Sequence, residues 1–308
     1  MSRENHCIPE NGNRLSEDVC NLLQHAPGLC NYHEIHHHDQ VQEILHRWPL
    51  LDLTAEKTVV SPPATSSPGQ GTNVVLVTGA AGGVGATTVV ANLASALRQQ
   101  GEQVLAVDLS PGQDLHLHLG KHGGETGTDD RKPMVEVLSA QDDHASLQGE
   151  DRHPNWLAAR LPAHLPDSYG WILIDCPWSA QATFHQARSI AHQVLLVCTT
   201  EPAAFSRTSR ALADPASALE SGADRLHMLI NRFNPAHLLQ QDIHTLLHSS
   251  SPVDLAPAEI PYDSRIADSL ALGRSFLSLD PDCEAAQCFH SLGYWLASQA
   301  AQRRAAAP

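Results

Sequence analysis

A glycine-rich stretch, GAAGGVGATT at residues 79–88, has the composition of a phosphate-binding loop. It follows the apolar run 74–79 and precedes a helical pattern at 87–100. Glycines at such a junction let backbone N–H groups approach phosphate oxygens, and the following helix directs its positive end toward the same point. A threonine in its first turn can place a hydroxyl on Mg²⁺. The stretch predicts a nucleotide-phosphate site, although a tight strand-to-helix turn without a ligand would also use glycines.

The stretch departs from the phosphate-loop pattern GxxxxGK[ST] at two positions. Ala80 stands where the pattern has its first glycine, and Ala86 stands where it has its lysine. That lysine places a positive charge on the β- and γ-phosphate oxygens and stabilises charge that develops during phosphoryl transfer. Because an alanine methyl group cannot do so, we expect nucleotide binding with slow hydrolysis or none.

The chain from Asn73 onward alternates short apolar runs with helical patterns. Most runs are continuous rather than alternating, which is typical of strands that are covered on both faces. The alternation predicts an α/β fold, a three-layer, doubly wound, mostly parallel sheet, with a short helical N-terminal extension. The stretch 112–168 is rich in histidine and weakly patterned, so its elements are not assigned. Strands are expected at 74–79, 103–109, 171–177, 193–199, 226–233 and 255–261, and helices at 39–47, 87–100, 178–190, 204–220, 236–248, 263–271 and 282–302.

Composition divides the chain into zones and excludes some classes of protein. Of the 308 residues, 19 are Lys or Arg and 34 are Asp or Glu, a net charge of −15 that disfavours a wide nucleic-acid or lipid-binding face. There is no run of 18 apolar residues, no signal-peptide layout at the start and no CxxC among seven cysteines, so we expect a cytoplasmic, reduced protein. We expect a polar segment at 1–57, a Pro/Ser/Gly linker at 58–72, a main domain at 73–303 and a tail at 304–308.

Several motifs resemble those of the ParA/MinD ATPases. GGVGATT resembles their deviant phosphate loop KGGVGKTT, and WILIDCP at 171–177 resembles their Walker B strand. VLAVDLSP at 104–111 resembles the strand before switch I, LINRFNP at 229–235 the strand that ends in an adenine-side Asn, and 260–281 the closing stretch. The resemblance is closer to the BcsQ (YhjQ) family of cellulose-biosynthesis proteins, in which a non-lysine also follows GGVG.

The N-terminal zone resembles a second family of the same system. Residues 18–35 (DVCNLLQHAPGLCNYHEI) and 45–53 (LHRWPLLDL) are similar to the small BcsR proteins, which partner BcsQ as separate chains. The two halves are expected to be joined here by the linker. The segment 1–57 is too small to fold alone. We therefore expect its apolar cluster of Trp48, Leu50 and Leu51 to dock on the main domain or a neighbouring subunit, or to fold back within the segment.

The resemblance assigns roles to individual residues and implies ATP and Mg²⁺ as cofactors. Thr87 is expected to bind Mg²⁺ directly and Asp175 through water, while Asp108 is the tentative catalytic carboxylate. Each polar strand end also has a structural alternative: a helix cap for Asp175, a loop start for Asp108 and a turn for Asn231. The expected nucleotide-binding residues are Gly82, Gly83, Val84, Gly85, Ala86, Thr87, Thr88, Asn231 and Pro261.

Departures from the family pattern shape the functional expectation. Ala81 stands in place of the signature lysine that reaches across the dimer, and Ser110 in place of a second switch I acid. The resemblance implies an ATP-stabilised homodimer that docks on subunits of the cellulose synthase complex, peripheral to the inner membrane through protein partners, with no direct nucleic-acid binding. The alternative is an active positioning ATPase that cycles on membrane or DNA. Arginines that could replace the missing charge are Arg207, Arg210 and Arg265.

A cluster of histidines leaves open a third functional class, that of metal-binding proteins. His33, His36, His37 and His38 form a cluster beside Glu34 and Asp39, a composition that can bind Zn²⁺ or Ni²⁺. Together with a phosphate loop, such a cluster suggests a metal-delivery GTPase. The chain has no NKxD guanine motif, however, and histidines are scattered throughout the sequence.

Overall fold

The computed structural model describes residues 37–47, 72–119, 135–139, 157, 169–213 and 226–306. The chain divides into two compact units, Met1–Pro49 and Leu50–Pro308. In the first unit the described helix is α2 (His37–Arg47), close to the expected helix at 39–47, with an ion pair of 2.9 Å between Arg47 and Glu43 on successive turns. The linker expected at 58–72 lies outside the described residues except for Thr72.

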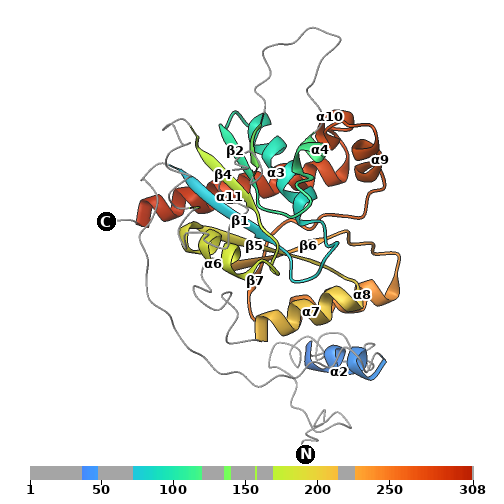
Figure 1. Cartoon of the computed structure of the whole chain (residues 1–308). Helices are drawn as coiled ribbons and strands as arrows, with labels where there is room; N and C mark the ends of the chain where they lie inside the picture. The colour runs from blue at the N-terminus through green and yellow to red at the C-terminus, as the bar shows by residue number, and fades with distance from the viewer. Residues whose placement is uncertain are drawn as a thin grey trace, which may run out of the picture. The chain divides into compact units, whose positions relative to one another are not determined.

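A single parallel sheet organises the second unit (Figure 1). In the described residues it has seven strands in the order β3-β2-β4-β1-β5-β6-β7, and every pairing is parallel. The predicted doubly wound α/β fold is therefore confirmed. The strands are β1 (Asn73–Thr78), β2 (Val104–Asp108), β3 (Glu136–Ser139), β4 (Trp171–Asp175), β5 (Gln193–Thr199), β6 (Leu226–Asn231) and β7 (Asp254–Leu255).

Continuous apolar runs form the central strands because both faces of the sheet are covered. In β1, Val75 and Val77 belong to a core with the helices α3 and α11, whereas Val74 and Leu76 belong to a second core with α6. Successive side chains of a strand point to opposite faces, so an unbroken apolar run serves both cores at once. The helices of this unit are α3 (Ala86–Gln99), α4 (Leu115–Leu119), α6 (Gln181–Ile190), α7 (Pro202–Ala213), α8 (Leu238–Ser250), α9 (Arg265–Ala271), α10 (Phe276–Leu279) and α11 (Glu284–Ala306).

The last helix, α11, packs on the domain. Phe289, Leu292 and Leu296 are fully buried in the core that α3 also lines, so this helix covers one face of the sheet. The helix continues to Ala306, so the expected tail at 304–308 begins inside it. In the described part of the chain no helix has the length and apolar character needed to cross a bilayer.

One edge strand, β3, was not expected. It lies in the stretch 112–168, and its register with β2 pairs Leu105 with Glu136 and Asp108 with Ser139. Val137 and Leu138 pack against the two cores, but the apolar run is only two residues long, and the backbone ladder to β2 extends it into a strand. The expected strand at 255–261 is shorter than predicted, because the ladder of β7 with β6 spans only Asp254 and Leu255.

Candidate functional site

The glycine loop lies at the carboxyl end of β1, between the ends of β4 and β5. Strand order reverses direction at this point, because the chain proceeds from β1 to one side of the sheet and later to the other. Crevices outside the carboxyl ends of parallel strands at such a reversal are the usual ligand sites of α/β sheets. The fold therefore places the predicted phosphate loop where a nucleotide is expected.

Backbone geometry leaves the loop open to an anion. Gly83 and Gly85 have φ angles of 79° and 89°, which side-chain-bearing residues rarely adopt. A Cβ atom added to Gly82 or Gly83 would find no described atom within 4 Å, so a ligand can approach this backbone. Gly85 is the N-cap of α3 and provides no side-chain cap, which leaves the first-turn N–H groups oriented toward the loop.

The end of β6 fastens the loop from the side. Asn231 is buried and donates from Nδ2 to the carbonyl of Val84 over 2.7 Å. Arg232, exposed and with a φ of 58°, donates from Nη1 to the carbonyl of Gly83 over 2.9 Å. A Cβ atom on Gly85 would lie 2.6 Å from Nδ2 of Asn231, so the close approach requires glycine there. Asn231 thus positions the loop backbone, a contact that sequence motifs did not reveal.

A buried carboxylate faces the first turn of α3. Thr87 and the Asp175 carboxylate are hydrogen-bonded, and Oδ2 of Asp175 has no hydrogen-bond partner in the described structure. Burial raises the pKa of Asp175 to about 7, with a smaller upward contribution from the charge of Asp108 and a downward one from the Thr87 hydrogen bond. An unpartnered buried carboxylate oxygen beside a hydroxyl suits a hydrated Mg²⁺ ion, which oxygen ligands bind. These residues fit the predicted metal site.

Asp108 organises the loop that follows β2. It is buried beside Asp175 in the strand register, and its Oδ1 accepts from the backbone N–H of Ser110 (2.9 Å) and from Oγ of Ser110 (2.6 Å). Its Oδ2 accepts from the N–H of Leu115 over 3.0 Å. Both oxygens therefore hold the loop into α4, in agreement with the loop-starting alternative, while the catalytic role of Asp108 stays a prediction.

The remaining predicted nucleotide residues lie around the same edge of the sheet. The backbone carbonyl of Thr88 accepts from Asn92 within α3. Pro261 forms a parallel bridge with Phe233, two residues after Asn231, so the two predicted adenine-side segments run next to each other. Ala86 is half-buried against the core, and Ala81 is buried in it. Both lysine positions are therefore occupied by methyl groups that pack inward.

The three arginines considered as replacements for the missing charge lie elsewhere. Arg207 and Arg210 are exposed on α7, and Arg265 pairs with Asp263 (2.6 Å) and with Asp280. Among the described residues, the arginine that contacts the phosphate loop is instead Arg232, which was not among the predicted candidates. The sequence feature that could have indicated Arg232 is its position directly after Asn231, the predicted adenine-side residue.

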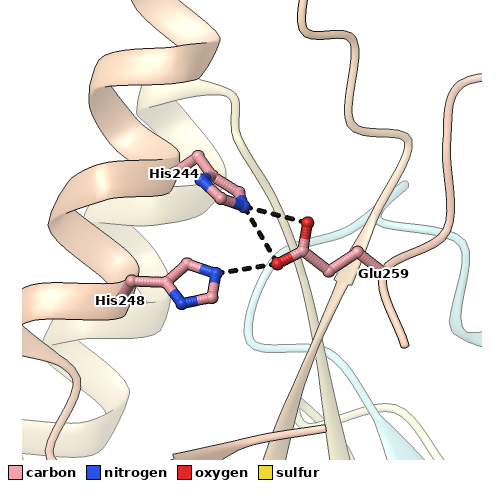
Figure 2. Close-up of side chains that lie close together, drawn as sticks. All are labelled: His244, His248 and Glu259. Carbon is pink, nitrogen blue, oxygen red and sulfur yellow. Dashed lines mark hydrogen bonds and ion pairs between the residues drawn. The ribbon is translucent and has the colours of Figure 1, made fainter. Parts of the chain in front are cut away.

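Some sequence predictions lie outside the described residues. These include the docking residues Trp48, Leu50 and Leu51, and most of the histidine cluster at 33–38. A different histidine cluster is described: His244 and His248 on α8 both reach Glu259 (Figure 2). The sequence shows that the two histidines are four residues apart on one helix and so share a face. That Glu259 lies beside them could be seen only in the folded structure.

Comparison with known proteins agrees with this architecture. The family model of the cellulose biosynthesis protein BcsQ matches residues 72–126 and 136–296. The putative septum site-determining protein MinD of Guillardia theta is 31% identical over 192 residues, which cover 55% of this chain and 67% of the relative. Cellulose biosynthesis protein BcsQ of Escherichia coli K12 is 28% identical over 237 residues, which cover 70% of this chain and 91% of the relative. The structure of MinD from Pyrococcus horikoshii OT3 complexed with Mg-ADP superposes with a TM-score of 0.53 at 22% identity, and covers 77% of this chain and 100% of that one.

The seven-stranded parallel sheet with a glycine loop after β1 defines a P-loop fold of the ParA/MinD class. Within that class, the family model covers more than half of the sequence. The chain belongs to the family of the cellulose biosynthesis protein BcsQ.

Proposed function

We propose that this protein is an ATP-binding accessory subunit of bacterial cellulose synthesis and secretion, in which bound ATP stabilises a dimer and is hydrolysed slowly or not at all. The observation that carries the proposal is an open glycine loop above a buried, unpartnered carboxylate oxygen, without a lysine at either family position. Membership of the BcsQ family supports the link to cellulose.

The proposed site holds the nucleotide mainly through backbone groups. The loop N–H groups from Gly82 to Thr88 face the β- and γ-phosphates, while Asn231 keeps the loop in place through Val84. Bound Mg²⁺ supplies positive charge to the phosphate oxygens. Thr87 would bind the ion directly and Asp175 would bind it through water. Asn231 and Pro261 flank the adenine.

Slow hydrolysis follows from the charges that the site lacks. Electrostatic stabilisation of the transition state accounts for a large part of phosphoryl-transfer catalysis, and losing one such donor typically lowers the rate by about 10²–10³. Both lysine positions hold alanine, and both carboxylate oxygens of Asp108 accept hydrogen bonds within its own loop. Arg232 lies on the loop and restores part of the charge needed for binding.

The dimer is the form proposed to dock on subunits of the synthase complex. Attachment to the inner membrane is then indirect, through those subunits. The N-terminal segment, with Trp48, Leu50 and Leu51, is proposed to dock on the P-loop domain of the same or a neighbouring chain. The acidic balance of the sequence, a net charge of −15, argues against direct binding to nucleic acid.

The first test identifies the nucleotide in the purified full-length protein. Mass is measured by light scattering with and without Mg-ATP, and the protein is then denatured and the released nucleotide identified by chromatography. We expect unhydrolysed ATP in a dimer. The variant T87V should lose the nucleotide and the dimer, whereas the matched variant T245V on α8 should retain both.

Other results would redirect the proposal. Released ADP together with rapid Mg²⁺-dependent turnover would identify an active positioning ATPase. No nucleotide, and no binding when Mg-ATP is added, would show that the loop no longer binds phosphate and that the protein acts as a scaffold.

A further inference from the structure

Three potential metal ligands, His244, His248 and Glu259, converge between α8 and the segment that follows β7. Nε2 of His244 lies 2.9 Å from each carboxylate oxygen of Glu259, and Nε2 of His248 lies 2.7 Å from Oε1 (Figure 2). The ligand atoms all lie within 4.8 Å of one another. The histidine side chains point from one face of α8, because positions four apart on a helix are neighbours.

The donor set is that of a borderline transition metal. Two imidazoles and one carboxylate are a known protein ligand set for Zn²⁺, with metal–ligand bonds of about 2.0–2.2 Å and a fourth position left for water. Ligand atoms around such a tetrahedral ion are about 3.3 Å apart. The present N–O separations are a few tenths of an ångström shorter, so a small outward movement of the side chains makes room for an ion.

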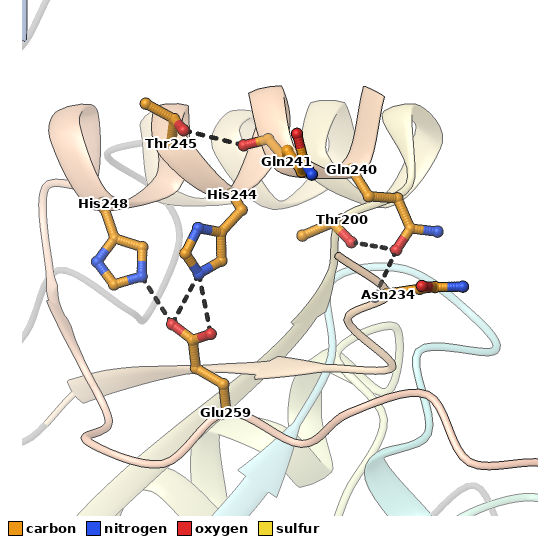
Figure 3. A network of polar contacts seen from close by, with 8 residues as sticks. All are labelled: Thr200, Asn234, Gln240, Gln241, His244, Thr245, His248 and Glu259. Atoms are coloured by element: carbon orange, nitrogen blue, oxygen red, sulfur yellow. Dashed lines mark hydrogen bonds and ion pairs between the residues drawn. The ribbon is translucent and has the colours of Figure 1, made fainter. Parts of the chain in front are cut away.

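The surroundings hold the histidines in place and leave the site open. The ring of Phe233 stacks on His244 with centroids 4.4 Å apart and an interplanar angle of 12°. Near the start of α8, Gln240 accepts from Thr200 Oγ1 and from the N–H of Asn234, which fixes the helix against the ends of β5 and β6 (Figure 3). The side chains of His244, His248 and Glu259 are 25%, 45% and 29% exposed, so an ion can enter from solvent.

We propose that His244, His248 and Glu259 bind one divalent transition-metal ion, with Zn²⁺ as the preferred ion and water in the open position. The ion cross-links α8 to the segment that follows β7. That segment is joined to β6 by hydrogen bonds from Ile260 to Ile230 (2.9 Å) and from Phe233 to Ile260 (3.1 Å). Metal binding therefore stabilises the fold around Pro261, and the proposal holds whether or not the P-loop binds ATP.

The test is a titration of the untagged full-length protein with Co²⁺, followed by competition with Zn²⁺. The visible absorption of Co²⁺ reports its ligands and geometry, and melting temperature is measured with and without Zn²⁺. His33, His36, His37 and His38 are replaced by Asn in all samples, because this cluster would compete for the ion. We expect one equivalent of bound metal and a higher melting temperature in Zn²⁺.

Variants decide between a metal site and a set of hydrogen bonds. H248Q and E259Q should each raise the metal dissociation constant by at least about tenfold and abolish the thermal shift. H237Q, at the exposed start of the same helix, should behave like the parent. The parent is the protein that carries the four Asn replacements, and melting curves in EDTA check that H248Q and E259Q fold as it does. If both variants bind metal as tightly as the parent, or if the parent binds no metal, the cluster is only a hydrogen-bonded ion pair and the proposal is wrong.

Discussion

The carboxyl group of Asp175 should bind a proton more tightly in the folded protein than in the unfolded chain. Its carboxyl group has a pKa of about 7 in the folded protein against 3.8 in a model peptide, chiefly because it is buried. Between these values the folded chain binds the proton and the unfolded chain does not, so the free energy of unfolding falls as pH rises. Below the lower value this contribution to stability is fully present, and above the higher value it is lost.

We therefore predict that metal-free wild type loses stability relative to D175N as pH rises from about 4 to about 7. The slope is about 1.4 kcal/mol per pH unit, and the total is at most about 4 kcal/mol. Urea unfolding in EDTA at several pH values measures it. Parallel curves for the two proteins would show that Asp175 titrates normally.

Arg232 is predicted to contribute to nucleotide affinity. Its guanidinium lies on the loop, at the Gly83 carbonyl, where family members with a phosphate-loop lysine have another source of charge. R232Q should weaken Mg-ATP binding about tenfold in calorimetric titration, because charge-assisted contacts are stronger than neutral ones. R207Q, which changes an exposed arginine on α7, is the control, and an equal loss in both variants would indicate only a general charge effect.

At the scale of elements, the contact between the loop and β6 predicts the effect of substituting Gly85. G85A places a residue with a side chain at a φ of 89° and brings Cβ to 2.6 Å from Asn231. We expect a loss of about 2–3 kcal/mol in free energy of unfolding, measured with urea.

The matched control for Gly85 is Gly101, which has a φ of 93° but open space where a Cβ would be. G101A should cost only the backbone strain, about 1 kcal/mol. Equal losses for G85A and G101A would mean that Asn231 moves away without cost and does not fix the loop.

The packing of α11 predicts a large difference between two aromatic residues of one helix. Phe289 is fully buried in the core shared with α3, whereas Tyr294 is 64% exposed. F289A should lower the free energy of unfolding by about 3–5 kcal/mol because it leaves a cavity, and Y294A should change it by less than about 0.5 kcal/mol. Chemical denaturation measures both, and a large effect of Y294A would point to a contact made by this surface with another part of the protein.

Elements with their own apolar pattern were predictable, and those defined by tertiary contacts were not. The runs at β1, β4 and β5 are apolar enough to be read directly, and the glycine loop between β1 and α3 follows from them. β3 was missed because its apolar run, Val137 and Leu138, is only two residues long, and the ladder with β2 extends it into a strand. The contacts of Asn231 and Arg232 with the loop were likewise not predictable. Arg232 adopts a left-handed backbone conformation that its sequence neighbours do not predict.

The cluster of His244, His248 and Glu259 likewise could not be predicted from the sequence, because tertiary contacts bring its residues together. A spacing of four residues on a helix is visible in the sequence, but Glu259 lies eleven residues beyond His248, after the short edge strand β7. The sequence pointed instead to the denser cluster at 33–38, because proximity along the chain is the signal that composition offers.

At the scale of the whole molecule, charge predicts which large partners are excluded. With 34 acidic and 19 basic residues, the chain lacks the excess of positive charge that sequence-independent DNA binding requires. We expect no binding to duplex DNA at physiological salt in fluorescence anisotropy, with or without Mg-ATP. Binding that weakens steeply as salt is raised would contradict this and favour the cycling ATPase.

The strand order has a consequence for how the protein is made. β1 pairs with β4 and β5, which begin roughly a hundred residues later, and the core beneath α3 is completed by α11 at the end of the described chain. At a synthesis rate of about 5–20 residues per second, the apolar β1 segment leaves the ribosome several seconds before either neighbour exists. During that interval the nascent chain exposes an unpaired segment whose four central residues, VVLV, are all apolar. Such a segment is prone to aggregate until its neighbours in the parallel sheet have been made.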